Sequence, residues 1–266
     1  MNETGHNIAV TILGSGTCVP SLDRAASSLL IAIGDVNLLI DIGPGTMRRL
    51  LEAGFSIYDI DYLFITHFHP DHTGELASFL FAMKCTDPGF LKKPLVLAGG
   101  PGFMLFYEKL KALYPQWVHL PDRLEIREFT GGNKDHPKLE TNNFKLFCTG
   151  VEHRPESLAF RVETPDGVCV VVSGDTDYSE NLVRLGEKAD LLVCESAFPD
   201  ELKVEGHLTP SIAGRLATNA RARNLVLTHF YPECDQEDIY GQCRETWSGP
   251  LMLAADLLKI NVTKSL

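Results

Sequence analysis

Short apolar runs separated by polar, glycine- and proline-rich segments recur along the whole chain. Runs of about four to eight apolar residues between turn-forming residues are typical of β-strands. The pattern predicts strands over residues 8–14, 28–33, 37–40, 62–65, 94–98, 124–129, 144–149, 159–164, 168–173, 190–194 and 224–228. We expect the first of these to be an edge strand that ends in the tight turn Gly14-Ser15-Gly16-Thr17.

Helices are predicted where apolar residues recur three or four positions apart. One such set follows residue 72: Leu76, Phe79, Leu80 and Met83. Thr209 and Pro210 are typical of the cap and the first position of a helix. Further helices are predicted over residues 46–53, 103–113, 179–186, 210–220 and 250–257.

Both halves of the chain contain a run of predicted strands accompanied by helices. This order indicates two sheets packed against each other with helices outside, a layered α/β architecture. At 266 residues, with 44% hydrophobic and 22% charged residues, the chain can bury a substantial core. No low-complexity linker or short repeat divides it, so we expect a single domain over residues 1–266.

Composition narrows the functional classes. The 24 lysines and arginines against 35 aspartates and glutamates give a formal net charge of -11, whereas nucleic-acid-binding proteins usually carry a basic footprint. The seven cysteines are odd in number and form no C-x-x-C pair, so we expect reduced core residues of a cytoplasmic protein. Signal-peptide and membrane-span patterns are absent from the sequence, so we expect no membrane partner.

The segment Thr66–His72 carries the strongest chemical signal. Four of its seven residues are potential metal ligands: His67, His69, Asp71 and His72. Their spacing does not fit one helix face, and Pro70 interrupts a helix, so the segment fits a strand-to-helix turn. Two groups of ligands pointing in different directions suit two adjacent metal ions. Histidines that merely line a turn are the alternative.

Three further ligand candidates follow apolar strands: His153, Asp175 and His229. Polar residues just past such strands lie along a common sheet edge, where α/β folds place their sites. Each could instead be a turn residue, and for Asp175 alone that is the simpler interpretation. Asp41 also ends a strand, and it either forms turn hydrogen bonds or supports the metal loop from behind.

The remaining histidines carry weaker signals. His207 precedes the helix predicted at 210–220, and it is either a loop residue or a group that contacts substrate oxygens or donates a proton near neutral pH. His119 and His136 lie in loop-like segments, and we expect both at the surface.

The segment T-H-F-H-P-D-H, followed in order by His153, Asp175 and His229, resembles the H-x-H-x-D-H signature and downstream motifs of the metallo-β-lactamase superfamily. Within the superfamily the chain most resembles the ribonuclease Z-like branch. The stretches that carry this second likeness are residues 14–20, 24, 27–28, 39–43, 173–176, 192–196 and 206–209. The match extends over nearly the whole length.

The resemblance implies an αββα sandwich with two zinc ions at one edge. Its implied ligands are His67, His69 and His153 for one ion, Asp71, His72 and His229 for the other, and Asp175 as the bridge. By the same resemblance, Asp71 is the base for the attacking water, and Glu195 with His207 protonates the leaving oxygen. Mixed histidine and carboxylate sites also accept manganese or iron.

One departure from the branch bears on the substrate. Members that process transfer RNA usually carry a glycine- and proline-rich arm after the third motif, whereas only residues 154–174 lie between His153 and Asp175 here. A predicted hairpin occupies this interval, so no arm fits. Together with the acidic charge, this argues against tRNA binding.

We therefore expect a zinc-dependent phosphodiesterase that acts on a small-molecule or short nucleotide phosphodiester, cyclic nucleotides included. A homodimer is the oligomeric state that we consider for it. The first alternative is a lactonase or other carboxyl-ester hydrolase, although such relatives often have a tyrosine near the metals and lack the Glu195–His207 pair. The second is a non-catalytic metal-binding or regulatory module. A structural site of that kind would be closed, whereas seven ligands for two metals leave room for water.

Overall fold

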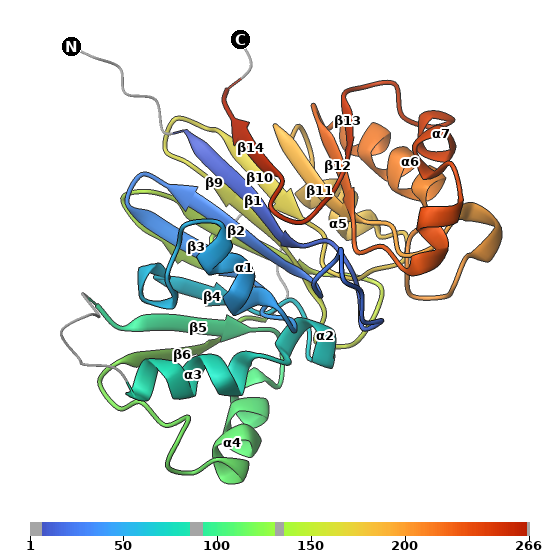
Figure 1. The fold of residues 1–266 in the computed structure, drawn as a ribbon. Helices are drawn as coiled ribbons and strands as arrows, with labels where there is room; N and C mark the ends of the chain where they lie inside the picture. Colours follow the sequence, from blue (N-terminus) through green and yellow to red (C-terminus); the bar gives the residue numbers. More distant parts are fainter. Residues whose placement is uncertain (1–6, 86–92, 131–135, 265–266) are drawn as a thin grey trace.

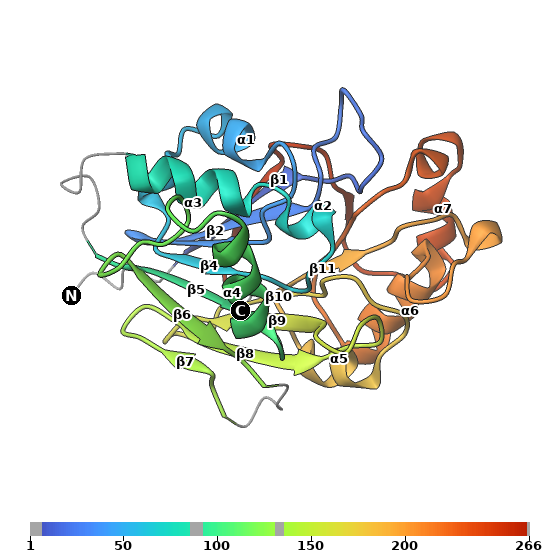
Figure 2. The same ribbon diagram turned by 90° about the horizontal axis from the view of Figure 1, so that it is seen from below.

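The computed structural model describes residues 7–85, 93–130 and 136–264. Two β-sheets pack face to face, with helices on their outer sides (Figure 1, Figure 2). The first sheet contains β1 (Ile8–Gly14), β2 (Ser28–Ile33), β3 (Val36–Ile40), β4 (Tyr62–Phe64), β5 (Leu95–Gly99), β6 (Leu124–Glu128) and β14 (Lys259–Val262). The second contains β7 (Leu139–Glu140), β8 (Lys145–Gly150), β9 (Leu158–Glu163), β10 (Cys169–Val172), β11 (Leu191–Glu195), β12 (Leu225–Thr228) and β13 (Leu251–Leu253).

The order of the strands mixes neighbours from distant parts of the chain. The two sheets have the orders β14-β1-β2-β3-β4-β5-β6 and β13-β12-β11-β10-β9-β8-β7. The helices of the first half are α1 (Thr46–Glu52), α2 (Pro70–Thr73), α3 (Leu76–Cys85) and α4 (Phe103–Leu113). Those of the second half are α5 (Glu180–Leu185), α6 (Pro210–Ala220) and α7 (Ile239–Arg244), and short 3₁₀ helices span Ile57–Asp59, Asp200–Leu202 and Pro232–Gln236. This is the αββα arrangement that the sequence predicts.

The inner strand β2 of the first sheet has two buried faces. In β2, Leu29, Ile31 and Ile33 point into the core shared by the two sheets, while Leu30 joins the core under the outer helices. Successive side chains of a strand point to opposite faces, so both faces of β2 are apolar. This explains why the strand is a continuous apolar run in the sequence instead of an alternating one.

The helix predicted over residues 250–257 is wrong. Leu251–Leu253 form β13, which pairs in parallel with β12 through Leu225 and Leu251. The chain then turns, and Leu257 has a φ of 66°, a left-handed conformation that a helix cannot include. The leucine- and alanine-rich composition favours a helix, but pairing with a distant strand outweighs that local preference.

The prediction that β1 is an edge strand is also wrong. The C-terminal strand β14 pairs antiparallel with β1, from Ile8 opposite Val262 to Thr11 opposite Lys259. Neither β14 nor α7 was expected from the sequence, because both are short and only partly buried, and their apolar periodicity is weak.

The cysteines agree with the sequence expectation in part. All seven are free thiols, and Cys148, Cys169, Cys194, Cys234 and Cys243 are buried. Cys18 and Cys85, however, are exposed, so they are not core residues. Among the helices of the described residues, none has the length and apolar character needed to span a membrane.

Candidate metal centre and active site

The predicted ligands meet at one end of the two sheets. His67 and His69 follow β4, while Asp71 and His72 lie in the one-turn helix α2, which begins at Pro70 (Figure 1). The others follow strands of the second sheet: His153 after β8, Asp175 after β10 and His229 after β12. Because the strands end on the same side, residues far apart in sequence converge on one site.

The first group of donor atoms comes from His67, His69, His153 and Asp175, and these atoms lie within 4.8 Å of one another. His69 Nδ1 is 3.0 Å from His67 Nε2 and 3.3 Å from His153 Nε2. Three imidazole nitrogens thus point at a common space.

The second group comes from Asp71, His72 and His229, whose donor atoms are equally close. His229 Nε2 is 3.3 Å from His72 Nε2 and 3.5 Å from Asp71 Oδ2. The two pairs of the T-H-F-H-P-D-H motif therefore point into different groups, as the spacing predicts.

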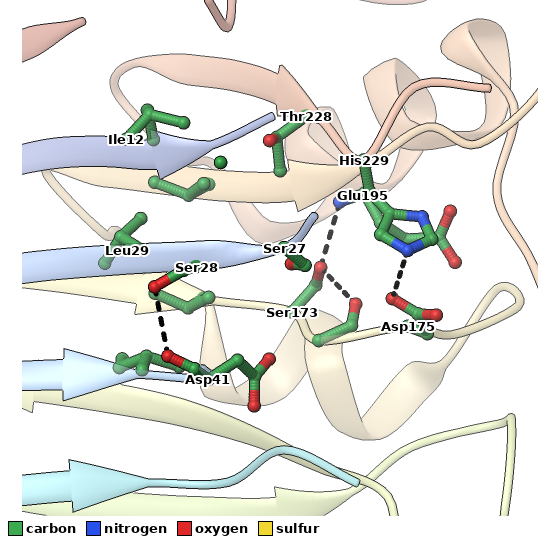
Figure 3. A pocket seen from close by; sticks show the side chains of 15 residues that line it. Ile12, Ser27, Ser28, Leu29, Asp41, Ser173, Asp175, Glu195, Thr228 and His229 are labelled. Carbon is green, nitrogen blue, oxygen red and sulfur yellow. Dashed lines mark hydrogen bonds and ion pairs between the residues drawn. The ribbon is translucent and has the colours of Figure 1, made fainter. Parts of the chain in front are cut away.

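Asp175 lies between the two groups. Its Oδ2 is 3.6 Å from His67 Nε2 in the first group. Its Oδ1 is 3.3 Å from His72 Nε2 and 3.4 Å from His229 Nε2 in the second, and Figure 3 shows Asp175 beside His229. One carboxylate oxygen faces each group, which is the placement that a bridging ligand needs.

The donor set fits metal ions. His67, His72, Asp175 and His229 are each at most 2% exposed, so bulk solvent does not reach their polar atoms. A neutral imidazole has one donor and one acceptor nitrogen, and several imidazole nitrogens facing one space cannot all be paired by hydrogen bonds. Converging nitrogen and carboxylate donors are the usual ligands of zinc, and they also suit manganese or iron.

Asp41 supports the motif from behind. Its Oδ1 accepts from the Thr66 backbone N–H at 2.8 Å, and its Oδ2 accepts from the Thr66 hydroxyl at 2.8 Å and from His72 Nδ1 at 2.7 Å. Its backbone φ is 60°, a conformation that aspartate and asparagine tolerate better than most residues. Of the two roles considered for Asp41, the contacts favour support of the metal loop.

A cavity of about 30 Å³ lies behind the donor atoms (Figure 3). Asp41, Asp175 and His229 line it, together with Ser28, whose hydroxyl donates to the Asp41 carbonyl oxygen at 3.0 Å. This contact holds the strand end that carries Asp41.

Most ring nitrogens that face away from the groups have partners. His67 Nδ1 is 3.0 Å from the Thr66 hydroxyl, and His153 Nδ1 is 2.9 Å from the Gly206 carbonyl oxygen. Such partners set the tautomer and orient the ring. His229 Nδ1, by contrast, is a buried nitrogen that has no hydrogen-bond partner among the described residues.

The histidines of the site differ in the direction in which their surroundings shift their pKa values. Burial, with the neighbouring imidazoles, holds the pKa of His67 well below its usual value. Burial also lowers the pKa of His72, but the carboxylates of Asp175 and Asp41 outweigh this and raise it. Burial raises the pKa of Asp175, yet the imidazoles around it dominate and lower that pKa well below its usual value. Asp175 is therefore a carboxylate, the form that binds cations.

Glu195 and His207 form a pair beside the two groups. His207 Nδ1 is 3.0 Å from Glu195 Oε1, and the Glu195 carboxylate also accepts from the backbone N–H groups of Thr176 at 2.8 Å and Ala197 at 3.1 Å. Burial raises the pKa of Glu195 above its usual value, although the hydrogen bond from His207 favours the ionised form. Although burial lowers the pKa of His207, the Glu195 carboxylate raises it above its usual value.

His207 faces the predicted ligands directly. Its ring centroid is 5.0 Å from that of His153 and 5.8 Å from that of His229. Thr209 occupies the N-cap position of α6 as predicted, although its side chain accepts no capping hydrogen bond. His119 and His136 are exposed, as expected.

Two aromatic residues at the site were not singled out from the sequence. Phe198 and Tyr231 stack with ring centroids 4.3 Å apart, and the Tyr231 ring lies 6.2 Å from His229. The Tyr231 hydroxyl is 3.4 Å from Cys18 Sγ. The available signal was their position, three residues after Glu195 and two after His229, in loops that leave strand ends.

A sequence profile of the family described as Anti-Pycsar protein Apyc1 matches residues 8–242. The chain belongs to this family. The match to the Apyc1 family begins with β1 and includes every predicted ligand as well as Glu195 and His207.

Individual relatives show which known enzymes and folds this Apyc1 family member resembles. Ribonuclease Z from Mycobacterium bovis is 28% identical over 280 residues, covering 96% of this chain and 98% of that protein. The solved metallo-beta-lactamase fold protein YhfI from Bacillus subtilis has a TM-score of 0.81 at 23% identity, covering 95% of this chain and 99% of its own. The short form of human tRNase Z has a TM-score of 0.79 at 25% identity, covering 96% and 100%. The chain has the metallo-β-lactamase fold and is a ribonuclease Z-like hydrolytic enzyme.

Proposed function

We propose that this protein is a zinc-dependent phosphodiesterase that hydrolyses small-molecule or short nucleotide phosphodiesters. The observation that carries the proposal is the position of Asp175, which presents one oxygen to each group of donor atoms. The Glu195–His207 pair lies against the same space.

His67, His69 and His153 would hold one zinc ion, and Asp71, His72 and His229 the other, with Asp175 between them. Two adjacent zinc ions supply a water of lowered pKa and offset the negative charge of a reacting phosphoryl group. Manganese or iron would also suit this mixture of nitrogen and oxygen donors.

The side chains around the donor groups would move the protons. Asp71 is 8% exposed and lies at the rim of the site, where it can orient the attacking water and take its proton. His207, whose pKa the Glu195 carboxylate raises, can donate a proton to the leaving oxygen. The acid and the base thus belong to different residues.

The Glu195–His207 pair suits a substrate whose leaving oxygen must be protonated as it departs. An alkoxide such as a ribose oxygen is a poor leaving group unless it is protonated, which favours a substrate matched to the Glu195–His207 pair. A lactonase or other carboxyl-ester hydrolase is the second candidate, because Tyr231 lies beside His229. The Tyr231 hydroxyl faces Cys18, so the first candidate has the stronger support.

The region after His153 does not contain an arm of the kind that grips transfer RNA in the resembled branch. Residues 154–174 are all described, and they contain the antiparallel hairpin of β9 and β10 instead of an arm. Together with the net charge of -11, this supports a small or short substrate.

Hydrolysis of bis(p-nitrophenyl) phosphate by the zinc-loaded protein tests the proposal, with a simple lactone assayed in parallel. Asp71→Ala should abolish diester turnover, whereas Asp35→Ala, an exposed residue of the β2–β3 turn, should retain it. Lactone opening without diester turnover would establish the second candidate. Diester turnover that survives removal of all metal would refute both.

A further inference from the structure

Two hollows flank the metal centre, and they differ in charge. One, here called the Asp71 groove, has a volume of about 470 Å³ and lies between the loop of residues 17–24, the start of α1 and Asp71. The other has a volume of about 700 Å³ and adjoins His153. Both are large enough for part of a small ligand, since such sites occupy about 300–1,000 Å³.

The charged side chains that line the two hollows indicate which hollow suits an anionic substrate. The Asp71 groove is lined by Arg24, Arg48 and Arg49 with one carboxylate, that of Asp71. The second hollow is lined by four carboxylates and one arginine: Glu152, Asp177, Glu180, Glu205 and Arg184. A phosphodiester is negatively charged, so the four carboxylates of the second hollow repel it more strongly than the groove does, where the arginines are balanced by Asp235, Glu52 and Asp256.

The walls of the groove suit a nucleoside better than a second phosphate. Apolar side chains line it, among them Val19, Pro20 and Pro44, and the side chain of Arg48 is 82% exposed beside them. Arg48 and Arg49 are already ion-paired with Glu52 at 2.9 and 2.7 Å, which reduces their attraction for a further phosphate. A guanidinium paired at its edge can still stack on a flat aromatic ring.

The loop that forms one wall is held at both ends by a single carboxylate. Asp256 accepts from the Ser15 backbone N–H at 2.9 Å and hydroxyl at 2.8 Å, and from the Ala25 backbone N–H at 2.7 Å. Arg24 further ties the loop to Asp235 and to the Ala254 carbonyl oxygen. A wall that is ordered before binding loses less entropy when a ligand enters.

The direction of the reaction decides which part of the substrate enters the groove. In an in-line displacement the leaving group lies opposite the attacking water. Asp71, the proposed base for that water, lines the groove, whereas the proposed acid His207 packs against His153 and His229. The groove therefore adjoins the water and not the leaving oxygen.

We propose that the Asp71 groove binds the nucleoside that stays on the phosphate after hydrolysis, which makes the groove-lining residues 17–22 and Arg48 the determinants of substrate specificity. The proposal rests on the proposed phosphodiesterase function and deepens it. It assigns an aromatic base and its sugar to the groove, and the departing alcohol to the side of His207.

Two esters with the same leaving group test the proposal. Thymidine 5′-p-nitrophenyl phosphate and methyl p-nitrophenyl phosphate both release p-nitrophenolate, so they differ only in the retained group. We expect kcat/KM for the nucleoside ester to exceed that for the methyl ester by about tenfold or more, the scale of stacking and burial of one base.

Groove-filling variants then locate the effect. Val19→Trp should lower kcat/KM for the nucleoside ester about tenfold, through KM, and leave the methyl ester within about twofold. Asp23→Trp is the matched control, because Asp23 is an exposed residue of the same loop that does not line the groove. Arg48→Ala removes the exposed guanidinium without adding bulk, and it should weaken the nucleoside ester selectively even if Val19→Trp fails to fold.

Equal loss on both esters in Val19→Trp and Arg48→Ala, or no preference of the unmodified protein for the nucleoside ester, would overturn the groove assignment alone. Turnover of the methyl ester would in either case leave the phosphodiesterase standing. If neither ester is hydrolysed by the zinc-loaded protein, the proposed function fails and the groove assignment falls with it.

Discussion

Replacement of Asp41 by asparagine isolates the support behind the metal loop. Asparagine is nearly the same size and tolerates the φ of 60° at this position, so the backbone should be retained. It has only one acceptor oxygen, however, whereas the two Asp41 oxygens accept from Thr66 N, Thr66 Oγ1 and His72 Nδ1. The amide N–H₂ must face at least one of these donors.

The size of the effect follows from this mismatch. Leaving a buried donor unpaired costs about 1–3 kcal/mol, and losing an outer partner of a ligating histidine weakens metal binding about 10–100-fold. A factor of ten corresponds to about 1.4 kcal/mol, so the two scales agree. Because His72 belongs to the second donor group, we expect zinc to be lost mainly from Asp71, His72 and His229.

Competition with a chromophoric zinc chelator measures the two affinities separately. Asp41→Asn should weaken one zinc site about 10–100-fold and the other little. Asp190→Asn is the matched control, since Asp190 is 4% exposed and accepts at 2.9 Å from the backbone N–H of Cys169, at the start of β10 and therefore at the end of that strand opposite Asp175. That variant should lose stability without losing zinc. Unchanged zinc affinity at both sites in Asp41→Asn would refute the reasoning.

Four further outcomes are expected. Asp175→Ala should bind clearly fewer than two zinc ions by elemental analysis, because one oxygen faces each donor group; full occupancy would exclude a bridge. His207→Ala should slow hydrolysis of esters with poor leaving groups about 10²–10⁴-fold and p-nitrophenyl esters much less; equal slowing would rule out the acid role. The pKa of His207 is raised by Glu195 in spite of burial, so its acid form persists to higher pH than that of a free imidazole, and turnover of poor leaving groups should fall as the pH rises through that pKa. Glu195→Gln should move this fall to lower pH, and a pH profile identical to that of the unmodified protein would contradict the pairing. Phe160→Ala, which removes a fully buried ring between the sheets, should lower the free energy of unfolding in urea by about 3–5 kcal/mol without changing zinc affinity.

Much of the site could be predicted from short stretches of sequence. The alternation of strand and turn places His67 to His72 after β4, and the bounds of β1 and α6 agree with the predicted 8–14 and 210–220. These features depend on neighbouring residues, such as Pro210 at the first helical position, so a local pattern is enough to predict them.

Other features depended on contacts between distant segments. The chain near residue 251 has a helical composition but forms β13 because β12 offers it a partner. The sequence leaves two roles open for Asp41, and the contact of its carboxylate with His72, 31 positions away in the chain, decides between them. Phe198, Tyr231 and Cys18 carry no motif, and they became site residues through the loops that bring them together.

The sequence alone therefore determined the type of chemistry: the identity of the donor residues, their order and the two-group spacing of the T-H-F-H-P-D-H motif. The tertiary structure decided which donors share a space, that Asp175 faces both groups, and that a groove lined by arginine and apolar side chains opens beside Asp71. The physical reason is the separation along the chain of the residues that each feature depends on. Ligand type and strand pattern are properties of adjacent residues, whereas a site and its charge arise from side chains that only the pairing and packing of distant strands bring within a few ångströms of one another.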